Sequence, residues 1–269
     1  MRALKAEFAK LKRSRMILWT ALVVLGYTSI GLAMYPVLDD MMAQGVAAAP
    51  GSPAAQVREA FARAGITEIN WDGAMRFVPM GVSGAWGIMV LSLIAAYVFG
   101  RDLREGTDIS SGTLPIRRET FVFAKMVVIA VWAVVLAALA VLAQVGVDLV
   151  HLGAEGLRFE YVWRAFLETL YVMLPLYLTL PVIGWLSLSR KGYLRPMLFA
   201  LVMFMASTGL VGLDAAAYFP WSMPIAAVGV TWMPAREALT IVSWLIALAV
   251  FAVGMFAVLR RVNRAGDVA

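Results

Sequence analysis

The sequence predicts an all-α integral membrane protein with six transmembrane helices. Of its 269 residues, 62% are hydrophobic and 15% are charged, whereas soluble domains carry about 25% charged residues. Six stretches contain no Asp, Glu, Lys or Arg and are long enough, or nearly so, to cross roughly 30 Å of hydrocarbon as a helix of about 20 residues. These stretches are residues 16–38, 77–100, 126–147, 169–189, 196–213 and 238–259, of which the fifth is the shortest.

Each of these stretches is expected to be helical, because lipid offers no hydrogen-bond partner to free backbone groups. No repeat of 20–50 residues appears, so residues 1–269 are expected to form a single transmembrane domain. The segments on one side of the predicted spans hold 17 Lys and Arg, and those on the other side hold six. The positive-inside rule therefore predicts a multi-pass protein with both termini in the cytoplasm.

Residues 1–15 are predicted to form an amphipathic helix that lies in the membrane interface, like an elbow before the first span. Leu4, Phe8 and Leu11 recur at helical spacing, and basic side chains beside such an apolar face favour binding in the plane of the head groups. The alternative is a basic tail that only sets the orientation. The predicted membrane-interface residues are Leu4, Phe8, Leu11, Lys10, Lys12 and Arg13.

The charged segment between the second and third predicted spans is expected to be a folded docking element. Arg101 and Glu105 stand at i and i+4, a pair that supports a helix, and Gly106 would end that helical turn. Thr107 could cap a second short helix, and Pro115 breaks the chain before the third span. The alternative is a solvated loop of mixed charge.

Residues 214–237 are longer than a simple connection needs and are interrupted by Pro220, Pro224 and Pro234. Proline interrupts helices, and tryptophan, here Trp221 and Trp232, favours the membrane interface. This composition predicts a re-entrant or interfacial hairpin before the last span. The alternative is an aromatic belt that only anchors the loop.

The composition excludes several kinds of site. The chain has no Cys and one His, which rules out disulfides, thiolate metal sites and His pairs, so neither a metal nor a catalytic residue is expected. An integral-membrane enzyme would have to use Asp148, His151 and Glu155, which are expected in an outer loop. No GxxxxGK[ST] motif occurs, so the chain is not expected to bind ATP itself. The predicted spans also lack the ionisable residues that proton- and sodium-driven carriers use.

Part of the sequence resembles a known family. The residues concerned are Phe99, Asp102, Glu105, Gly106-Thr107, Leu114-Pro115, Arg117-Arg118 and Ala124-Lys125. This pattern resembles the first cytoplasmic loop of permease subunits of the type-2 ABC exporter family. The basic segment Lys10–Arg15 and the stretch Tyr218–Pro224 are similar to the bacitracin- and lantibiotic-resistance permeases of that family.

The resemblance implies that a coupling helix docks on a separate ATP-binding subunit, which would hold ATP and Mg, while this chain binds no cofactor. The implied coupling residues are Arg101, Asp102, Arg104, Glu105, Gly106, Thr107, Pro115, Arg117 and Arg118. Short re-entrant helices between the last two spans would close the outer end of the pathway, with Pro220, Trp221, Pro224 and Trp232 as the outer gate.

The function implied is that of a permease in the bacterial plasma (inner) membrane that exports a peptide antibiotic, a drug-like amphiphile or a lipid. Its partners would be the ATP-binding subunit, a second permease copy or a paralogue, and membrane lipid, with no nucleic acid. Two alternatives remain: a non-transporting scaffold or immunity subunit, and, with less support, the integral-membrane enzyme.

Overall fold

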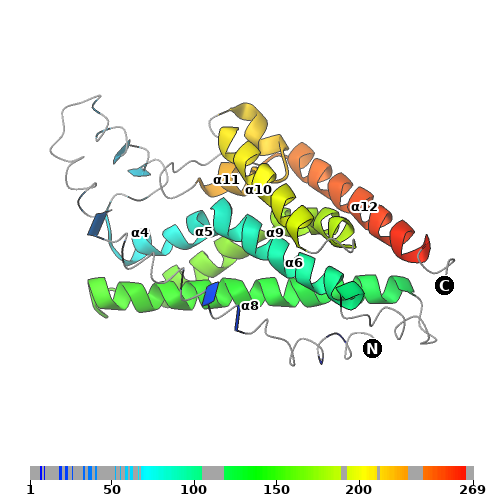
Figure 1. Ribbon diagram of the computed structural model, residues 1–269. Coiled ribbons are helices and arrows are strands. Elements are labelled where there is room, and N and C mark those ends of the chain that lie inside the picture. The colour runs from blue at the N-terminus through cyan, green and yellow to red at the C-terminus, as the bar shows by residue number, and fades with distance from the viewer. Residues whose placement is uncertain are drawn as a thin grey trace.

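The computed structural model describes residues 68–104, 118–188, 193–210, 213–229 and 239–264, with single positions between Glu7 and Ile66. These residues form a bundle of helices without any strand among them (Figure 1). In chain order the elements are α4 (Trp71–Met75), α5 (Phe77–Gly81), the π-helix η1 (Val82–Trp86), α6 (Gly87–Arg104), α8 (Arg118–Leu152), α9 (Phe159–Ser187), α10 (Leu194–Gly209), the 3-10 helix η2 (Asp214–Tyr218), α11 (Met223–Val228) and α12 (Ile241–Arg264). The predicted all-α class is confirmed.

Among the described residues, four helical stretches are long and apolar enough to cross a membrane. They are Trp71–Asp102, Glu119–Leu152, Phe159–Ser187 and Ile241–Arg264. Helix α10 is apolar but has 16 residues, which corresponds to about 24 Å at 1.5 Å per residue. The structure therefore supports a multi-pass membrane protein.

The first predicted span, 16–38, falls mostly outside the described residues, as does the predicted elbow helix, 1–15. Leu18 and Trp19 are among the few described positions there, and both are helical. The count of six spans thus stays a prediction.

Several helices extend beyond the uncharged stretches that predicted them. Helix α8 continues past the predicted span 126–147 to Leu152, and α9 begins at Phe159, ten residues before the predicted span 169–189. Similarly, α4 begins at Trp71, before the predicted span 77–100. Charged residues mark the edge of the hydrocarbon but not the end of a helix, since a helix can continue wherever its charged side chains find water or an ion partner.

Helix α9 lies at the centre of the bundle and contacts α6, α8, α10 and α12. Two close approaches fix its packing. A Cβ atom at Gly184 would lie 2.9 Å from a ring carbon of the buried Phe99 on α6, and one at Gly254 of α12 would lie 2.9 Å from the Cβ of Pro181. Small residues at such positions let membrane helices come together closely.

The stretch Trp71–Asp102 consists of α4, α5, η1 and α6 in succession and contains a kink; α4 to α6 are here named the helix train. Gly84 has φ −83° and ψ −149°, outside the helical region, within the π-helix η1 that joins α5 to α6. π-helical turns inside longer helices are a known cause of kinks. From Gly87 the train continues as α6 to Arg104 without interruption.

Residues 214–229, here named the fold-back segment, return along α10. The Trp221 ring packs edge-on against Phe199 of α10, with ring centroids 5.7 Å apart. Phe199 lies ten residues before the last residue of α10, Gly209, or about 15 Å along the helix axis. The chain therefore passes the end of α10 and then turns back beside it.

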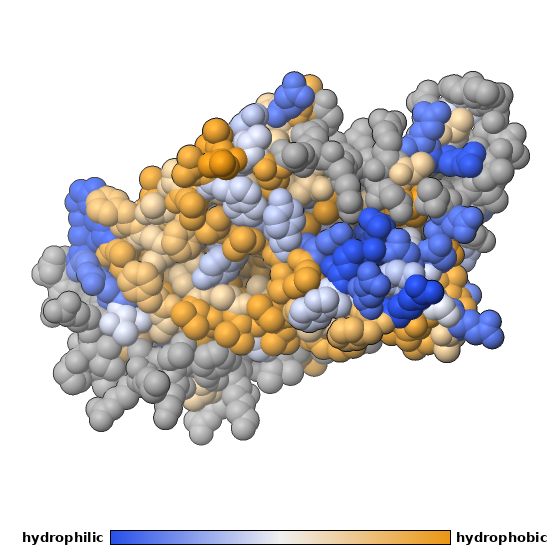
Figure 2. All heavy atoms as spheres, turned by 180° about the vertical axis from the view of Figure 1, so that it is seen from behind, coloured by the Kyte–Doolittle hydropathy of each residue, from blue (hydrophilic) through white to orange (hydrophobic). Residues whose placement is uncertain are grey.

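The surface agrees with a membrane setting. Figure 2 shows hydrophobic residues over most of one face, with hydrophilic residues gathered towards its two sides. Helix α12 is the least covered spanning helix, with 28% of its most apolar window buried. From Ile241 to Phe256 its exposed side chains are apolar, as surfaces that face lipid require, whereas the exposed Arg260, Asn263 and Arg264 lie in its last turns.

Candidate functional site

The base of the predicted docking loop is tied by a buried ion pair. Lys125 of α8 donates from Nζ to Oδ2 of Asp102 at 2.7 Å and to the carbonyl oxygen of Val98 at 2.6 Å, both on α6. The two charged side chains are 9% and 15% exposed. The pair fastens the end of α6 to the start of α8 at what we call the loop end of the bundle, on the right in Figure 1.

Arg101 lies beside this pair and is also buried. Its guanidinium carbon lies 5.7 Å from the centroid of the Tyr97 ring, a cation–π geometry. Two of the predicted coupling residues, Arg101 and Asp102, thus make contacts within this chain. Arg104 and Arg118 are the last residue of α6 and the first of α8. The other predicted coupling residues, Glu105, Gly106, Thr107, Pro115 and Arg117, lie outside the described residues.

The fold-back segment is joined to the kinked helix train by Ser83. This fully buried hydroxyl lies 2.8 Å from the carbonyl oxygen of Met80 and 2.5 Å from that of Gly229, so its one proton is shared between them. Gly229 ends α11 with φ 75° and ψ −169°, a backbone region that is essentially restricted to glycine. The conformation of Gly229 aims its carbonyl at the kink.

Most of the predicted outer-gate residues are packed inside the protein. Pro220, Trp221 and Pro224 are buried, whereas Trp232 lies outside the described residues. The Ser222 hydroxyl holds the turn between η2 and α11 by hydrogen bonds to the carbonyl oxygens of Ala216 (2.6 Å) and Phe219 (3.0 Å). Irregular backbone is tolerated in a membrane where protein covers it.

These two contact regions stand at opposite ends of one stretch of helix. Ser83 lies at the kink and Asp102 near the end of α6. The 18 residues of α6 span about 27 Å. Helix α6 therefore links the loop end to the kink, and Ser83 contacts the fold-back segment on the other side of that kink.

At the other end of the bundle, sequence reasoning missed an ion-pair cluster. Asp72 of α4 accepts from Arg76 at 3.2 Å and makes a short hydrogen bond with Arg164 of α9. Arg164 also lies over the Tyr161 ring, 5.7 Å from its centroid. The i, i+4 spacing of Asp72 and Arg76 could have predicted that these two residues pair. Nothing in the sequence indicated the pairing of Asp72 with Arg164, which lies 92 residues away.

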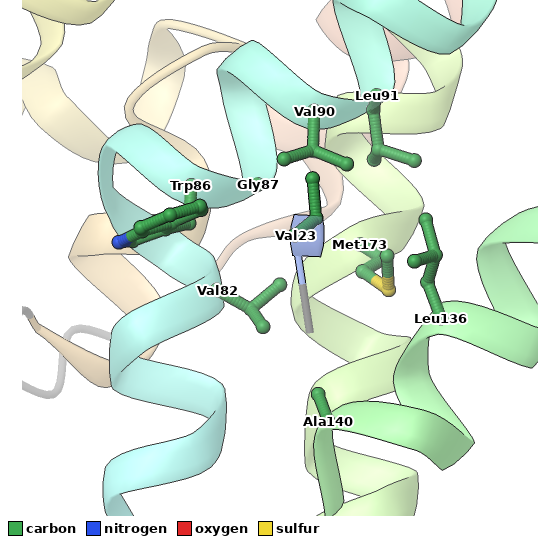
Figure 3. Close-up of a pocket in the computed structure, with 9 residues that line it drawn as sticks. All are labelled: Val23, Val82, Trp86, Gly87, Val90, Leu91, Leu136, Ala140 and Met173. Atoms are coloured by element: carbon green, nitrogen blue, oxygen red, sulfur yellow. The ribbon is translucent and has the colours of Figure 1, made fainter. Parts of the chain in front are cut away.

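A small apolar cavity borders the kink (Figure 3). Trp86 and Gly87 line it from the helix train, Leu136 from α8, Met173 from α9 and Val23 from the predicted first span. Its volume of about 50 Å³ is far below the roughly 300–1,000 Å³ of sites for drug-sized ligands. The cavity leaves free space beside the kink but cannot hold such a cargo.

Comparison with known proteins decides the family. The family described as ABC-2 family transporter protein matches residues 3–207. This chain belongs to the ABC-2 transporter family.

A curated relative of this ABC-2 permease is a bacitracin transport permease protein of Bacillus licheniformis, 24% identical over 136 residues. The match covers 51% of the present chain and 65% of the relative, which is less than two thirds of the relative's length. No solved structure matches the chain. The family match confirms the resemblance that the loop motif indicated.

The residues considered for an enzyme are not brought together in this ABC-2 permease. Asp148 is buried within α8 and accepts a hydrogen bond from Nε2 of Gln144 at 2.8 Å, whereas His151 is exposed. Glu155 follows the end of α8, so it does not share a helix with Asp148 and His151. Within the described part of the chain, no group of three or more His, Asp or Glu could hold a metal ion.

Proposed function

We propose that this ABC-2 permease is the membrane subunit of an ATP-driven exporter that is coupled through residues 101–118 to a separate ATP-binding subunit. The observation that carries the proposal is the unbroken run of α6 from the kink beside the fold-back segment to the loop end. ATP and Mg would be held by the partner, since this chain lacks the phosphate-binding motif.

In the proposed mechanism, closure of two ATP-binding subunits pushes the loop. The Asp102–Lys125 pair makes α6 and α8 move together, and α6 carries the movement to its kink. There the hydrogen bond from Ser83 to Gly229 draws the fold-back segment, with Trp221 and Pro220, away from the outer end of the pathway.

The proposed topology has six spans, an elbow helix at residues 1–15 and a re-entrant segment between the last two spans. The return of Trp221 to the level of Phe199 supports the re-entrant segment. The excess of Lys and Arg supports a cytoplasmic position of the loop end and both termini of a protein in the bacterial plasma membrane.

The working unit in this proposal is a dimer of permeases, and cargo passes between the two copies. Support comes from the small volume of the cavity at the kink, which leaves no room there for a drug-sized molecule. The name of the Bacillus licheniformis relative favours a peptide antibiotic of the bacitracin type as the cargo. An amphiphilic drug or a lipid would suit the same apolar surfaces.

The test is a charge reversal in the loop, Arg104→Glu combined with Glu105→Arg, in permease co-expressed with its ATP-binding subunit. The double variant keeps the net charge, so we expect unchanged membrane levels but a loss of co-purifying subunit and of export of at least tenfold. The control is Glu155→Arg, an exposed residue between α8 and α9 that should leave both unchanged.

Export that persists at the wild-type rate in the loop variant would contradict the coupling role of residues 101–118. A complex that forms normally but moves no cargo, even as wild type, would favour the scaffold or immunity subunit instead.

A further inference from the structure

A groove runs along the last turns of α12 at the loop end of the bundle. It has a volume of about 520 Å³, enough for more than a dozen water molecules at roughly 30 Å³ each. Trp185, near the end of α9, forms one wall. The α12 residues lining it are Val253 and Phe256 in the apolar part and Arg260, Arg261 and Arg264 in the last turns.

The charged part of the groove is purely cationic. Three arginines line it, and none of the described residues that line it is acidic. Among the described residues, neither Arg260 nor Arg264 forms an ion pair. Arg261 is held in place, since its guanidinium carbon lies 5.9 Å from the centroid of the Trp185 ring and Nη1 lies 3.4 Å from the Trp185 carbonyl oxygen. This arrangement suits an anionic group such as a phosphate.

The other part of the groove is apolar and open to the surroundings. Val253 and Phe256 are 69% and 65% exposed. They belong to the spanning stretch of α12, and Arg264 lies eight residues beyond Phe256, or about 12 Å along the axis. A hydrocarbon surface thus leads directly into a cluster of arginines at the end of a membrane-spanning helix. Basic pockets in this position are typical of sites for anionic lipid head groups.

We propose that this groove binds an anionic phospholipid, with the phosphate between Arg260 and Arg264 and one acyl chain along Val253 and Phe256. That the bound lipid belongs to the cytoplasmic leaflet rests on the proposed function and its orientation of the chain. The binding of its phosphate and acyl chain by the groove does not depend on that orientation. The lipid would act as a structural ligand that holds the end of α12 against α9.

A second copy of the chain is a poorer occupant. In a twofold-symmetric interface the same patch meets itself, so the arginine cluster of one copy would face that of the other without an acidic residue in the groove to separate them. An aqueous partner could reach the arginines but not Val253, which lies eleven residues, about 16 Å, before Arg264 inside the apolar stretch.

The test is native mass spectrometry of the purified full chain with dioleoyl phosphatidylglycerol and, in parallel, dioleoyl phosphatidylcholine. We expect the wild type to retain the anionic lipid preferentially. Arg260→Gln combined with Arg264→Gln should weaken its binding roughly tenfold to thirtyfold, since each basic residue near the membrane surface contributes a factor of about five in affinity. The control, Arg158→Gln with Arg195→Gln, removes the same charge from exposed positions outside the groove and should bind as the wild type does.

A second measurement needs no variant and so does not depend on how the variants fold. Phosphatidylglycerol with a photoreactive acyl chain should crosslink to the wild type at Val253–Phe256 or Trp185. Crosslinks at other positions would overturn the proposal. So would control substitutions that weaken lipid binding as much as the groove substitutions do. A groove variant that loses a dimer of the chain but keeps the lipid would also overturn it. Because lipid binding is read without ATP or a partner, its failure is distinguishable from failure of the coupling test.

Discussion

Lys125 makes two contacts at once, to the Asp102 carboxylate and to the Val98 carbonyl, and so holds the start of α8 against the last turns of α6. Both members of the ion pair are largely hidden from solvent. A charged pair in this setting costs desolvation when it forms, but losing one partner costs more, because the other charge stays buried.

We therefore expect Lys125→Met to destabilise the permease by about 3 kcal/mol, measured by unfolding in mixed micelles with increasing SDS. Asp102→Asn combined with Lys125→Met removes both charges and should recover more than half of that loss. Arg195→Met, at an exposed position, is the control and should change stability by less than about 0.5 kcal/mol. If the double variant is as unstable as Lys125→Met alone, the loss of stability does not come from leaving the Asp102 charge without its partner.

At the scale of elements, the helix train α4–α5–η1–α6 and the fold-back segment are joined by the hydrogen bond from the Ser83 hydroxyl to the Gly229 carbonyl oxygen. A hydrogen bond has a defined direction and length. The proposed transmission from loop to gate passes through this point. Helices α9 and α12 also pack on the segment, since Met223 is buried against Leu178 and Ala247.

Ser83→Ala removes the donor and leaves the buried Gly229 carbonyl without it, at a cost of about 1–3 kcal/mol. In the coupled complex we expect ATP hydrolysis to continue while export falls, because the loop end is untouched. Ser187→Ala is a matched control. Ser187 is also buried, and its hydroxyl bonds the Ile183 carbonyl in its own helix. Export that falls as far in the Ser187 variant would mean that Ser83 acts through packing alone.

On the scale of the whole molecule, α6 and α12 end and α8 begins on the same side of the bundle (Figure 1). This arrangement places the end of α6, the start of α8 and the arginine groove at the same end of the bundle. The connection between α8 and α9 lies at the opposite end, near the Asp72–Arg164 pair. The proposed sidedness of the two ends rests on the counts of Lys and Arg and can be tested directly.

Because the chain contains no cysteine, single-cysteine variants need no prior substitutions. A membrane-impermeant maleimide should label Ala154→Cys in intact cells and label Ser111→Cys only after the membrane is permeabilised. Both positions are expected in water, so a permeabilised sample is the control for reactivity. Labelling of Ser111→Cys in intact cells would reverse the proposed orientation and remove the docking loop from the cytoplasm.

By itself the sequence determined the all-α class, the membrane setting and the family resemblance. These properties depend on composition and on motifs close together in the chain: uncharged runs must be helical in lipid, and the loop pattern around Gly106-Thr107 is local. It also brought Asp102 and Lys125 into one motif without showing that they pair.

Only the tertiary structure decided where the helices end and which distant residues meet. The structure extends α8 past Asp148 to Leu152. The pairing of Asp72 with Arg164, the contact of Ser83 with Gly229 and the groove between α9 and α12 join segments far apart in the chain. Hydropathy and spacing describe one helix at a time, whereas these contacts depend on how neighbouring helices pack.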